Sequence, residues 1–383
     1  MLVLDPLDDL ICLGADNGAA AGPVLAPVAR ASLYRQETIE ALLAGLQREN
    51  DAFIYARGAN PTVRAFETAL AKLERAEAAK AFASGMGAIS ATLFALLKSG
   101  DHILFVNDIY GPTRELAARL ADFGVTHSQT FSAAPDEIAS ALRPQTRIVY
   151  LESPGSTLFR LAPVAAIADC AHRAGALLVI DNTVATPLLQ KPLGLGADLV
   201  IHSCSKYLGG HSDLVGGAVA GDAALVAQIF QQGYMLLGAA MAPDIAFLLL
   251  RGMMTLPARL RRHHDDALTL AGRLKTHPRV RRVFHPAFCE ADAALYAAQM
   301  RGHSGLFSVE LEVASFGELL ARVNRLRLFG KAVSWGGVES LVMIGHKQDP
   351  GAGAARIPRG LMRLSVGLEG VDALWADLQQ ALS

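Results

Sequence analysis

The sequence predicts an α/β fold in which a large domain with a mainly parallel sheet precedes a smaller α+β domain. Three observations support this prediction. Short runs of consecutive apolar residues alternate with amphipathic helical patterns through the first part of the chain, as in a parallel sheet that is covered on both faces. After about Arg251 that alternation ends, and segments typical of half-exposed strands follow. The length of 383 residues suits two or three domains better than one.

Residues 1–57 carry little regular pattern and are predicted to form an N-terminal arm. Residues 14–27 combine glycine, alanine and proline, which is typical of an extended segment rather than a core element. A regular pattern starts at Pro61. From there to Glu77, apolar residues recur every three or four positions and predict an amphipathic helix.

Residues 58–250 are predicted to form the large domain. Its expected strands are five apolar runs: Ala79–Phe82, Ile103–Val106, Ile148–Leu151, Leu177–Ile180 and Leu199–Ile201. Its expected helices are Gly87–Leu97, Pro112–Phe123 and Val164–Ala174. Functional residues collect at the carboxyl ends of parallel strands. Polar residues end or follow three of these runs, at Glu152-Ser153-Pro154, at Asp181 and at Ser203–Lys206.

Residues 251–383 are predicted to form the smaller α+β domain. Its expected elements are a long helix over Arg259–His277, strands over Gly305–Glu312 and Met362–Val366, and a closing helix over Val371–Leu382. The most apolar stretch of the chain, Met235–Leu250, is interrupted by Pro243. It is too short to cross a bilayer, so we expect a buried helix there.

Composition and charge exclude several classes of protein. Apolar residues make up 52% of the chain and charged residues 19%, which supports a sizeable core and argues against disorder. The net charge of -1 lacks the basic excess of a nucleic-acid-binding protein. We therefore interpret the basic cluster Arg259–His264 as a solvent-exposed helix face. Neither a nucleic acid nor a membrane is an expected partner.

The cysteines and the amino terminus indicate a cytoplasmic protein. The four cysteines lie far apart without a Cys-x-x-Cys pair, so neither a disulfide framework nor a metal site is expected. The first residues show no basic segment followed by an apolar one, so no secretory signal is predicted. A reducing compartment fits both observations.

Lys206 and Asp181 together offer the two groups that pyridoxal 5'-phosphate (PLP) requires. Lys206 lies in a turn rich in serine and glycine after a predicted strand, and its amine can form a Schiff base with the cofactor aldehyde. Asp181 ends a neighbouring predicted strand, where its carboxylate can keep the pyridine nitrogen protonated. Alone, Lys206 fits an ordinary surface lysine and Asp181 a turn or helix-cap residue. Their occurrence together favours a PLP-binding site over these two separate interpretations.

Two segments are candidates for binding the cofactor phosphate. The hydroxyls of Ser203 and Ser205 flank the Lys206 turn and can donate hydrogen bonds to a phosphate. The segment Ser84–Gly87 lies between a predicted strand and a predicted helix, where backbone N–H groups favour an anion. By itself, this second segment also fits a plain strand-to-helix turn.

Tyr110 and Arg363 are further candidates for the same site. Tyr110 follows a predicted strand and can stack on the pyridine ring, although a core or rim tyrosine fits equally well. Arg363 lies inside a predicted strand and can hold a substrate carboxylate through two parallel hydrogen bonds. An exposed arginine on an edge strand fits that pattern at least as well.

From about Gly22 to its C-terminus, the sequence resembles the Cys/Met-metabolism family of PLP-dependent enzymes, which have fold type I. The motifs that carry the resemblance are Tyr55-Ala56-Arg57, Asn60-Pro61-Thr62, Ser84-Gly85-Met86, Tyr110-Gly111, Asp181-Asn182-Thr183, Ser203–Gly210, Ser334-Trp335-Gly336-Gly337, Glu339-Ser340-Leu341 and Arg363–Glu369. The resemblance implies a PLP-dependent transferase-like fold, with residues 58–250 as the PLP-binding domain. It also implies a homotetramer built from two dimers, in which the N-terminal arm contributes to assembly.

The resemblance assigns roles to particular residues of this chain. The implied cofactor-binding residues are Lys206, Asp181, Thr183, Ser203, Ser205, Gly85, Met86 and Tyr110, together with Tyr55 and Arg57 of a neighbouring subunit. The implied substrate-binding residues are Arg363, Ser334, Trp335 and Ser156, again with Tyr55 and Arg57. The implied catalytic residues are Lys206, Tyr110 and Tyr55.

Within the family, several segments resemble the bacterial cystathionine β-lyases, namely Glu152–Ser156, Lys206–Asp213, Gly305–Ser308 and Ser334–Gly337. The γ-synthases and γ-lyases usually carry Asn in place of Ser156 and Leu in place of Trp335, and many carry Glu in place of Val333. Methionine γ-lyases carry a cysteine in place of Pro112.

Other positions depart from the β-lyase pattern. Arg57 is followed by Gly58 where well-known β-lyases have a second arginine, and Asn60-Pro61-Thr62 resembles the γ-enzymes. Ser205 replaces the family's usual threonine but keeps its hydroxyl. The resemblance therefore implies β-elimination of L-cystathionine to homocysteine, pyruvate and ammonia, with Lys206 as the base. A γ-lyase, methionine γ-lyase, γ-synthase or sulfhydrylase of the family is an alternative, and a PLP-binding regulatory protein with little turnover is another.

Overall fold

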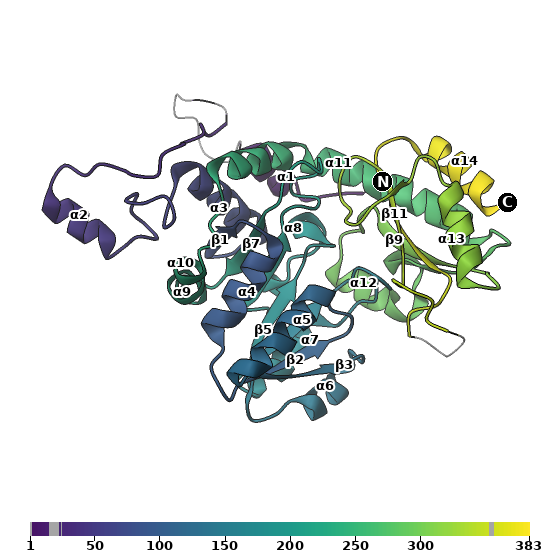
Figure 1. Ribbon diagram of the computed structural model, residues 1–383, viewed down its shortest axis with the longest axis horizontal. Coiled ribbons are helices and arrows are strands. Elements are labelled where there is room, and N and C mark those ends of the chain that lie inside the picture. The colour runs from purple at the N-terminus through teal and green to yellow at the C-terminus, as the bar shows by residue number, and fades with distance from the viewer. Residues whose placement is uncertain (1, 15–22, 24, 352–355) are drawn as a thin grey trace.

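The computed structural model describes residues 2–14, 23, 25–351 and 356–383. Within these ranges, seven strands form a large sheet in the order β1-β7-β6-β5-β4-β2-β3 (Figure 1). They are β1 Ala78–Phe82, β2 His102–Val106, β3 Thr126–Thr130, β4 Thr146–Glu152, β5 Leu177–Asp181, β6 Leu199–Ser203 and β7 Gly217–Gly221. Neighbouring strands from β6 to β3 run parallel, and β7 runs antiparallel to both β6 and β1. The predicted mainly parallel sheet is confirmed.

All five predicted strands are present, as β1, β2, β4, β5 and β6, whereas β3 and β7 were not predicted. The edge strand β3 consists of Thr-His-Ser-Gln-Thr and therefore shows no apolar run. The buried strand β7 consists only of glycine, alanine and valine. Its small residues are required by close packing, because a Cβ atom at Gly217 would lie 2.2 Å from the carbonyl oxygen of Ser84.

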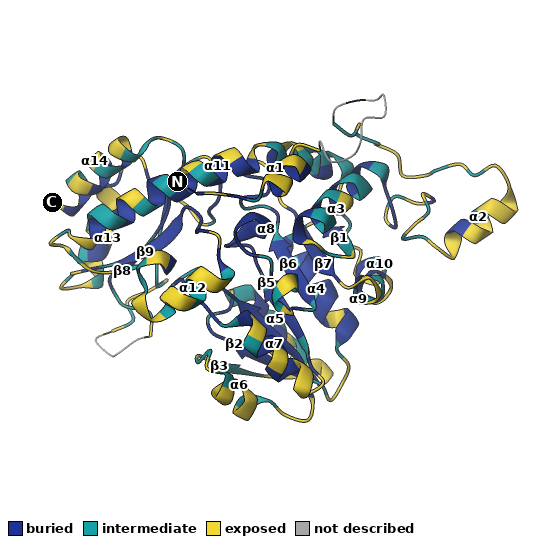
Figure 2. Cartoon of the chain, turned by 180° about the vertical axis from the view of Figure 1, so that it is seen from behind, coloured by how far each residue is buried: buried dark blue, intermediate teal, exposed yellow. Residues whose placement is uncertain are grey.

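Helices cover both faces of the large sheet. The helices α4 (Gly85–Leu96), α5 (Gly111–Leu120) and α9 (Ala223–Ile229) contribute to the core on one face. On the other face lie α3 (Pro61–Glu74), α6 (Pro135–Ala141), α7 (Val164–Arg173) and α8 (Thr186–Leu189). Successive residues of β2 alternate between these two cores. Figure 2 shows the strands between them as buried.

The smaller domain contains a second sheet. Its five described strands have the order β10-β11-β12-β9-β8. They are β8 Val280–Phe284, β9 Leu306–Leu311, β10 Gly330–Lys331, β11 Leu341–Ile344 and β12 Leu361–Ser365. The pairs are antiparallel except β10 with β11. The helices α13 (Phe316–Arg325) and α14 (Val371–Leu382) share its core, and α12 (Ala293–Gln299) packs against the large domain. The two predicted strands and the predicted closing helix are confirmed.

The helix α11 runs from Pro243 to Lys275 and connects the two cores. The sequence had suggested two separate helices here, divided near residue 250; instead the short helix α10 (Met235–Leu237) is followed by one long helix. The predicted exposure of the basic cluster is wrong for Arg259, His263 and His264, which are buried because elements of both domains cover that side of α11. Of the helices in the described ranges, none combines the length and apolar content that a membrane crossing requires.

The N-terminal region is more regular than its sequence suggested. The helix α1 (Pro6–Cys12) is capped by Asp5, whose carboxylate accepts the N–H of Leu7 at 3.0 Å, and it packs against α3 and α11. The helix α2 (Ile39–Leu46) instead extends away from the body of the molecule (Figure 1). Most of the segment 14–27, expected to be extended, lies outside the described residues.

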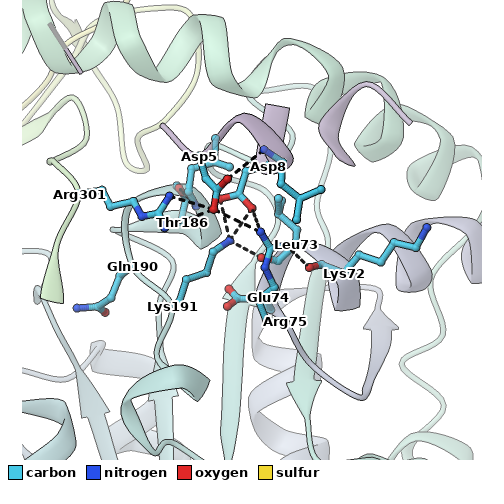
Figure 3. A network of polar contacts seen from close by, with 12 residues as sticks. Asp5, Asp8, Lys72, Leu73, Glu74, Arg75, Thr186, Gln190, Lys191 and Arg301 are labelled. Carbon is cyan, nitrogen blue, oxygen red and sulfur yellow. Dashed lines mark hydrogen bonds and ion pairs between the residues drawn. The ribbon is translucent and has the colours of Figure 1, made fainter. Parts of the chain in front are cut away.

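A buried network of charges holds α1 against the large domain (Figure 3). The carboxylate of Asp8 is fully buried and accepts hydrogen bonds from Arg75 at 2.8 Å and Lys191 at 3.1 Å. The neighbouring Asp5 forms an ion pair with Arg301, which lies in the chain between α12 and β9. The first residues of the chain therefore contact both domains.

Candidate active site

A cavity of about 810 Å³ lies where the carboxyl ends of the large sheet's strands face loops of the smaller domain. Twelve of the predicted site residues line it: Gly85, Met86, Tyr110, Ser156, Asp181, Thr183, Ser203, Ser205, Lys206, Ser334, Trp335 and Arg363. They come from segments as distant in sequence as α4 and β12. The structure thus brings together what the sequence only suggested as separate motifs.

Lys206 lies in the turn after β6, and its amine points into this cavity. Its Nζ atom donates a hydrogen bond to the hydroxyl of Ser334 at 2.5 Å and lies 5.3 Å from the ring centroid of Trp335. Burial lowers the pKa of Lys206 to about 8, and the guanidinium of Arg363 acts in the same direction, while the carboxylate of Asp181 opposes both. Near neutral pH, a useful fraction of this amine is therefore unprotonated and able to act as a nucleophile or base.

Asp181 ends β5 and is held by its own turn. Its Oδ1 atom accepts hydrogen bonds from the backbone N–H of Thr183 at 3.0 Å and from the Thr183 hydroxyl at 2.5 Å. The Thr183 hydroxyl also accepts the N–H of Ser203, which joins this turn to β6. Burial raises the pKa of Asp181, and the Thr183 hydrogen bonds and nearby His202 counteract that rise.

His202 lies between Asp181 and the charged residues around Asp8. It is fully buried, and its Nε2 atom lies 2.5 Å from the carboxylate of Glu74. Glu74 belongs to the same region as Asp8 and Lys191 in Figure 3. The sequence suggested no role for His202 or Glu74, because each lies inside a regular element and its hydrogen-bond partner is far away in sequence.

The start of α4 and two serine hydroxyls form an anion-binding corner of the cavity. Ser84 caps α4 by accepting the N–H of Gly87 at 2.9 Å. A Cβ atom at Gly85 would lie 3.1 Å from the Ser203 hydroxyl, so glycine is needed for the helix start to approach β6 this closely. The Ser205 hydroxyl contacts the backbone of Gly216. Helix N-termini with nearby hydroxyls favour phosphate groups.

Arg363 and Ser334 form the opposite side of the cavity. Burial lowers the pKa of Arg363 to about 10, and the guanidinium donates one hydrogen bond, to the carbonyl of Ser156 at 3.1 Å. Ser334 has a φ of 88°, which is unusual for a non-glycine residue and indicates a conformation imposed by its surroundings. Gly336 allows this loop to pack directly on the backbone of the Lys206 turn, where a Cβ atom would lie 2.9 Å from the N atom of Tyr207.

Tyr55 and Arg57 do not line the cavity of their own chain. The ring of Tyr55 is 45% exposed, and Arg57 donates a hydrogen bond to the carbonyl of Met235 at 3.1 Å. Both lie near the base of the arm that carries α2. The structure therefore places them apart from the other predicted site residues.

Several cavity residues were not predicted to belong to the site. Glu152 ends β4 beside Asp181, and its position at a strand end was visible in the sequence, but no role followed from it. Glu339 accepts a hydrogen bond from the hydroxyl of Ser212, and this contact joins the two domains at the cavity wall. The apolar side chains of Val215 and Val333 lie at the cavity and are largely exposed. No sequence signal distinguishes Val215 from an ordinary loop residue, whereas Val333 stands at a position that the family resemblance had already marked.

These groups match the parts of the cofactor expected from the sequence. The Lys206 amine suits an aldehyde, the buried carboxylate of Asp181 suits a protonated ring nitrogen, and the start of α4 with Ser203 and Ser205 suits a phosphate. The residues present therefore fit pyridoxal phosphate. No group of histidine, cysteine, aspartate and glutamate suited to a metal ion occurs among the described residues.

Comparisons with known proteins agree with this chemistry. Residues 9–383 match the family described as Cys/Met metabolism PLP-dependent enzyme. An L-methionine gamma-lyase of Pseudomonas putida is 40% identical over 378 residues, which cover 96% of this chain and 95% of the relative. A cystathionine beta-lyase of Coxiella burnetii is 37% identical, with coverage of 97% and 96%. The solved structure of a cystathionine gamma synthase from Xanthomonas oryzae pv. oryzae, in complex with aminoacrylate and cysteine, has a TM-score of 0.89 and 36% identity, with coverage of 98% and 97%.

Proposed function

The chain belongs to the family of Cys/Met metabolism PLP-dependent enzymes, and from this premise we propose that it catalyses β-elimination of L-cystathionine. The reaction consumes one water molecule and yields homocysteine, pyruvate and ammonia. The observation that carries the proposal is the position of the Lys206 amine, whose pKa of about 8 makes it a base near neutral pH, between Asp181 and Arg363. A base, an anion for the cofactor ring and a cation for the substrate carboxylate are what elimination from an amino acid requires.

The cofactor would supply the electron-withdrawing group, and residues of the chain would hold it in the cavity. Pyridoxal phosphate, when bound, supplies an electron-withdrawing ring that stabilises negative charge at the substrate Cα. In the proposal, Lys206 would hold the cofactor aldehyde, and the carboxylate of Asp181 would keep the ring nitrogen protonated. The helix start at Gly85 and Met86, with Ser203 and Ser205, would bind the phosphate. Tyr110, which lies on the cavity wall, would contribute an aromatic contact to the cofactor.

The substrate is held by residues of both domains. Arg363 binds the α-carboxylate, for which its buried guanidinium has donors available besides the one that Ser156 accepts. Besides holding the cofactor, the Lys206 amine would accept the proton from the substrate Cα over a short distance. The Ser334 hydroxyl orients that amine. Trp335 is buried against the ring of Tyr207 and forms a rigid wall of the pocket.

The choice of cystathionine and of β-elimination rests on the resemblance to the β-lyases at Ser156, Val333 and Trp335. The 40% identity to an L-methionine gamma-lyase favours a second candidate, γ-elimination. The decisive assay incubates purified holoenzyme with L-cystathionine and, separately, with L-methionine, and identifies the keto acid and thiol released. Pyruvate with homocysteine supports the proposal. 2-Oxobutyrate as the main product contradicts it, and absence of turnover that Lys206→Ala leaves unchanged indicates a binding protein instead.

A homotetramer with shared active sites is part of the proposal. The arm around α2 exposes large apolar side chains, including Leu33 at 71%, Ile39 at 66% and Leu43 at 56%. A second subunit that covers these side chains would receive Tyr55 and Arg57 near its own cofactor, which accounts for their absence from the cavity of their own chain. Light scattering of the purified protein tests this; a monomer of 40.5 kDa contradicts it.

We also propose a cytoplasmic location. All four cysteines are free in the structure, and three of them are buried. Free thiols are typical of proteins in a reducing compartment. Fractionation of the source cells, followed by detection of the protein in each fraction, tests this assignment, and recovery from an extracytoplasmic fraction contradicts it.

A further inference from the structure

Glu152 occupies a position in the cavity for which the reaction scheme has no use. It is the last residue of β4 and pairs in register with Asp181, the last residue of β5. The two side chains therefore lie next to each other where the strands reach their carboxyl ends. Only 6% of Glu152 is exposed. A buried acid beside another acid is costly unless one of them is neutral or its charge serves a purpose.

Within the described part of the chain, the side chain of Glu152 accepts one hydrogen bond, and its donor is Tyr110. The backbone N–H of Tyr110 donates to its Oε1 atom at 2.6 Å, across 42 residues of sequence. Tyr110 precedes α5, and its carbonyl accepts hydrogen bonds from the first turn of that helix, while no side chain caps the helix start. Glu152 therefore fixes the backbone from which the half-exposed Tyr110 ring extends over the cavity.

The surroundings distribute charge unequally between the two acids. Asp181 has two hydrogen bonds from Thr183, and these, with the nearby side chains of His202 and Lys206, lower its pKa against the effect of burial. Glu152 forms no ion pair with any described residue. Burial, followed by the charge of Asp181, raises the pKa of Glu152 well above its ordinary value, and the N–H of Tyr110 and the charge of Arg114 oppose that rise only in part. A group in this position keeps its proton when its neighbour has lost one.

We propose that Glu152 is a positioning residue that stays protonated and fixes Tyr110 over the cofactor, so that Asp181 is the single deep carboxylate facing the ring. A second negative charge would disturb the balance between ring nitrogen and Asp181, whereas a neutral acid adds a hydrogen-bond acceptor without that charge. The placement of the cofactor is taken from the proposed function, but the protonation of Glu152 is a property of the chain alone.

Infrared difference spectroscopy of the purified protein near neutral pH tests the protonation directly. A protonated carboxyl has a C=O stretch well separated from that of a carboxylate. We expect the wild-type spectrum minus that of Glu152→Gln to contain the protonated band, both with and without bound cofactor. Glu115→Gln, which changes an exposed glutamate of α5, is the matched control and should give a carboxylate band only. A carboxylate band at Glu152 overturns the proposal.

Cofactor affinity tests the positioning role. Glutamine retains a carbonyl oxygen that can accept the Tyr110 N–H, so Glu152→Gln should keep the dissociation constant for PLP within about threefold of wild type. Glu152→Ala leaves that N–H without its partner and should weaken PLP binding by about tenfold. Equal losses of PLP affinity in the two variants overturn the positioning role of Glu152. If Glu152→Ala does not fold, Glu152→Gln serves as the test alone. A loss of PLP affinity of more than tenfold in that variant then overturns the positioning role. An intact protonated band without a borohydride-reducible PLP adduct at Lys206 would instead count against the proposed function.

Discussion

At the scale of single residues, Lys206 is the group on which the proposed chemistry depends. Lys206→Ala removes the base, and we expect turnover to fall by about 10²- to 10⁴-fold or more. Borohydride reduction of the wild-type holoenzyme followed by peptide mapping should locate the pyridoxyl group at Lys206. Lys347→Ala changes an exposed lysine and should leave both results as in wild type. A tag on another lysine would show that the cofactor attaches elsewhere.

Arg363 gives a second test at this scale. Arg363→Ala removes the proposed partner of the substrate carboxylate and should raise KM by about 10- to 100-fold, which corresponds to losing hydrogen bonds to a charged group. Arg363→Lys should recover only part of the loss, because an ammonium cannot form two parallel hydrogen bonds. Steady-state kinetics measures both variants, and the exposed Arg282 on β8 provides the control. An unchanged KM in Arg363→Ala would remove the arginine from the substrate site.

Single residues of the candidate site could be proposed from sequence where the residue type itself suggests a chemical role. Lys206, Asp181 and Arg363 are of this kind, and the structure brings the three to one cavity. Glu152 and His202 were missed because their importance comes from burial and from a hydrogen-bond partner far away in sequence. A pattern of neighbouring residues contains no information on such partners until the strands are aligned.

At the scale of elements, the helix α1 depends on Asp8. Replacing this fully buried carboxylate by asparagine removes the anion that Lys191 pairs with, and it leaves Arg75 only the longer contact with Asp5, at 3.7 Å. We expect Asp8→Asn to lower the free energy of unfolding by about 3 kcal/mol, at the low end of the usual cost because Arg75 is partly solvated. Urea denaturation measures the change.

Asp9 offers a matched control on the same helix. Its ion pair with Arg261 is about one third exposed on both sides, so Asp9→Asn should cost less than about 1 kcal/mol. Equal effects of the two substitutions would mean that the buried network in Figure 3 does not hold α1 in place.

Elements were predicted well where their pattern was long and apolar. The central residues of β2, β4 and β5 are buried, so these strands carry runs of consecutive apolar residues that are visible in the sequence. The helix α1 has seven residues, which is too few for a 3.6-residue period to be recognised. Its stability comes from packing and from charges contributed by distant segments, and local sequence does not express these.

At the scale of the whole molecule, the active site exists only because two domains meet. The hydrogen bond between Lys206 and Ser334 joins residues separated by 128 positions, and Arg363 reaches Ser156 across 207. The sequence indicated which motifs belonged together through family resemblance. It did not indicate that α11 would run unbroken through both cores, since its interior proline, Pro257, would ordinarily suggest a break.

Buried histidines should make the folded molecule sensitive to acid. Burial lowers the pKa of His285 to about 3 and that of His102 and His263 to about 4, whereas an unfolded histidine has a value near 6.5. Below about pH 6.5 these histidines bind protons in the unfolded state but remain neutral in the folded state. The free energy of unfolding therefore decreases as the pH falls from about 6.5 toward 4. Glu152 and Asp181 act in the opposite direction, because their raised pKa values keep protons on the folded state.

A single substitution separates the histidine contribution from that of the acids. His285 packs against the rings of His303 and Phe288 and is 2% exposed. His285→Gln should be less stable than wild type near pH 7.5, but the difference in unfolding free energy should shrink by about 2 kcal/mol near pH 5, since only the wild type loses the histidine contribution. His127→Gln, at an exposed position of β3, is the matched control for replacing a histidine by glutamine. A constant difference for His285→Gln would mean that its ring is protonated as readily in the folded protein as in the unfolded chain, and that acid sensitivity originates elsewhere.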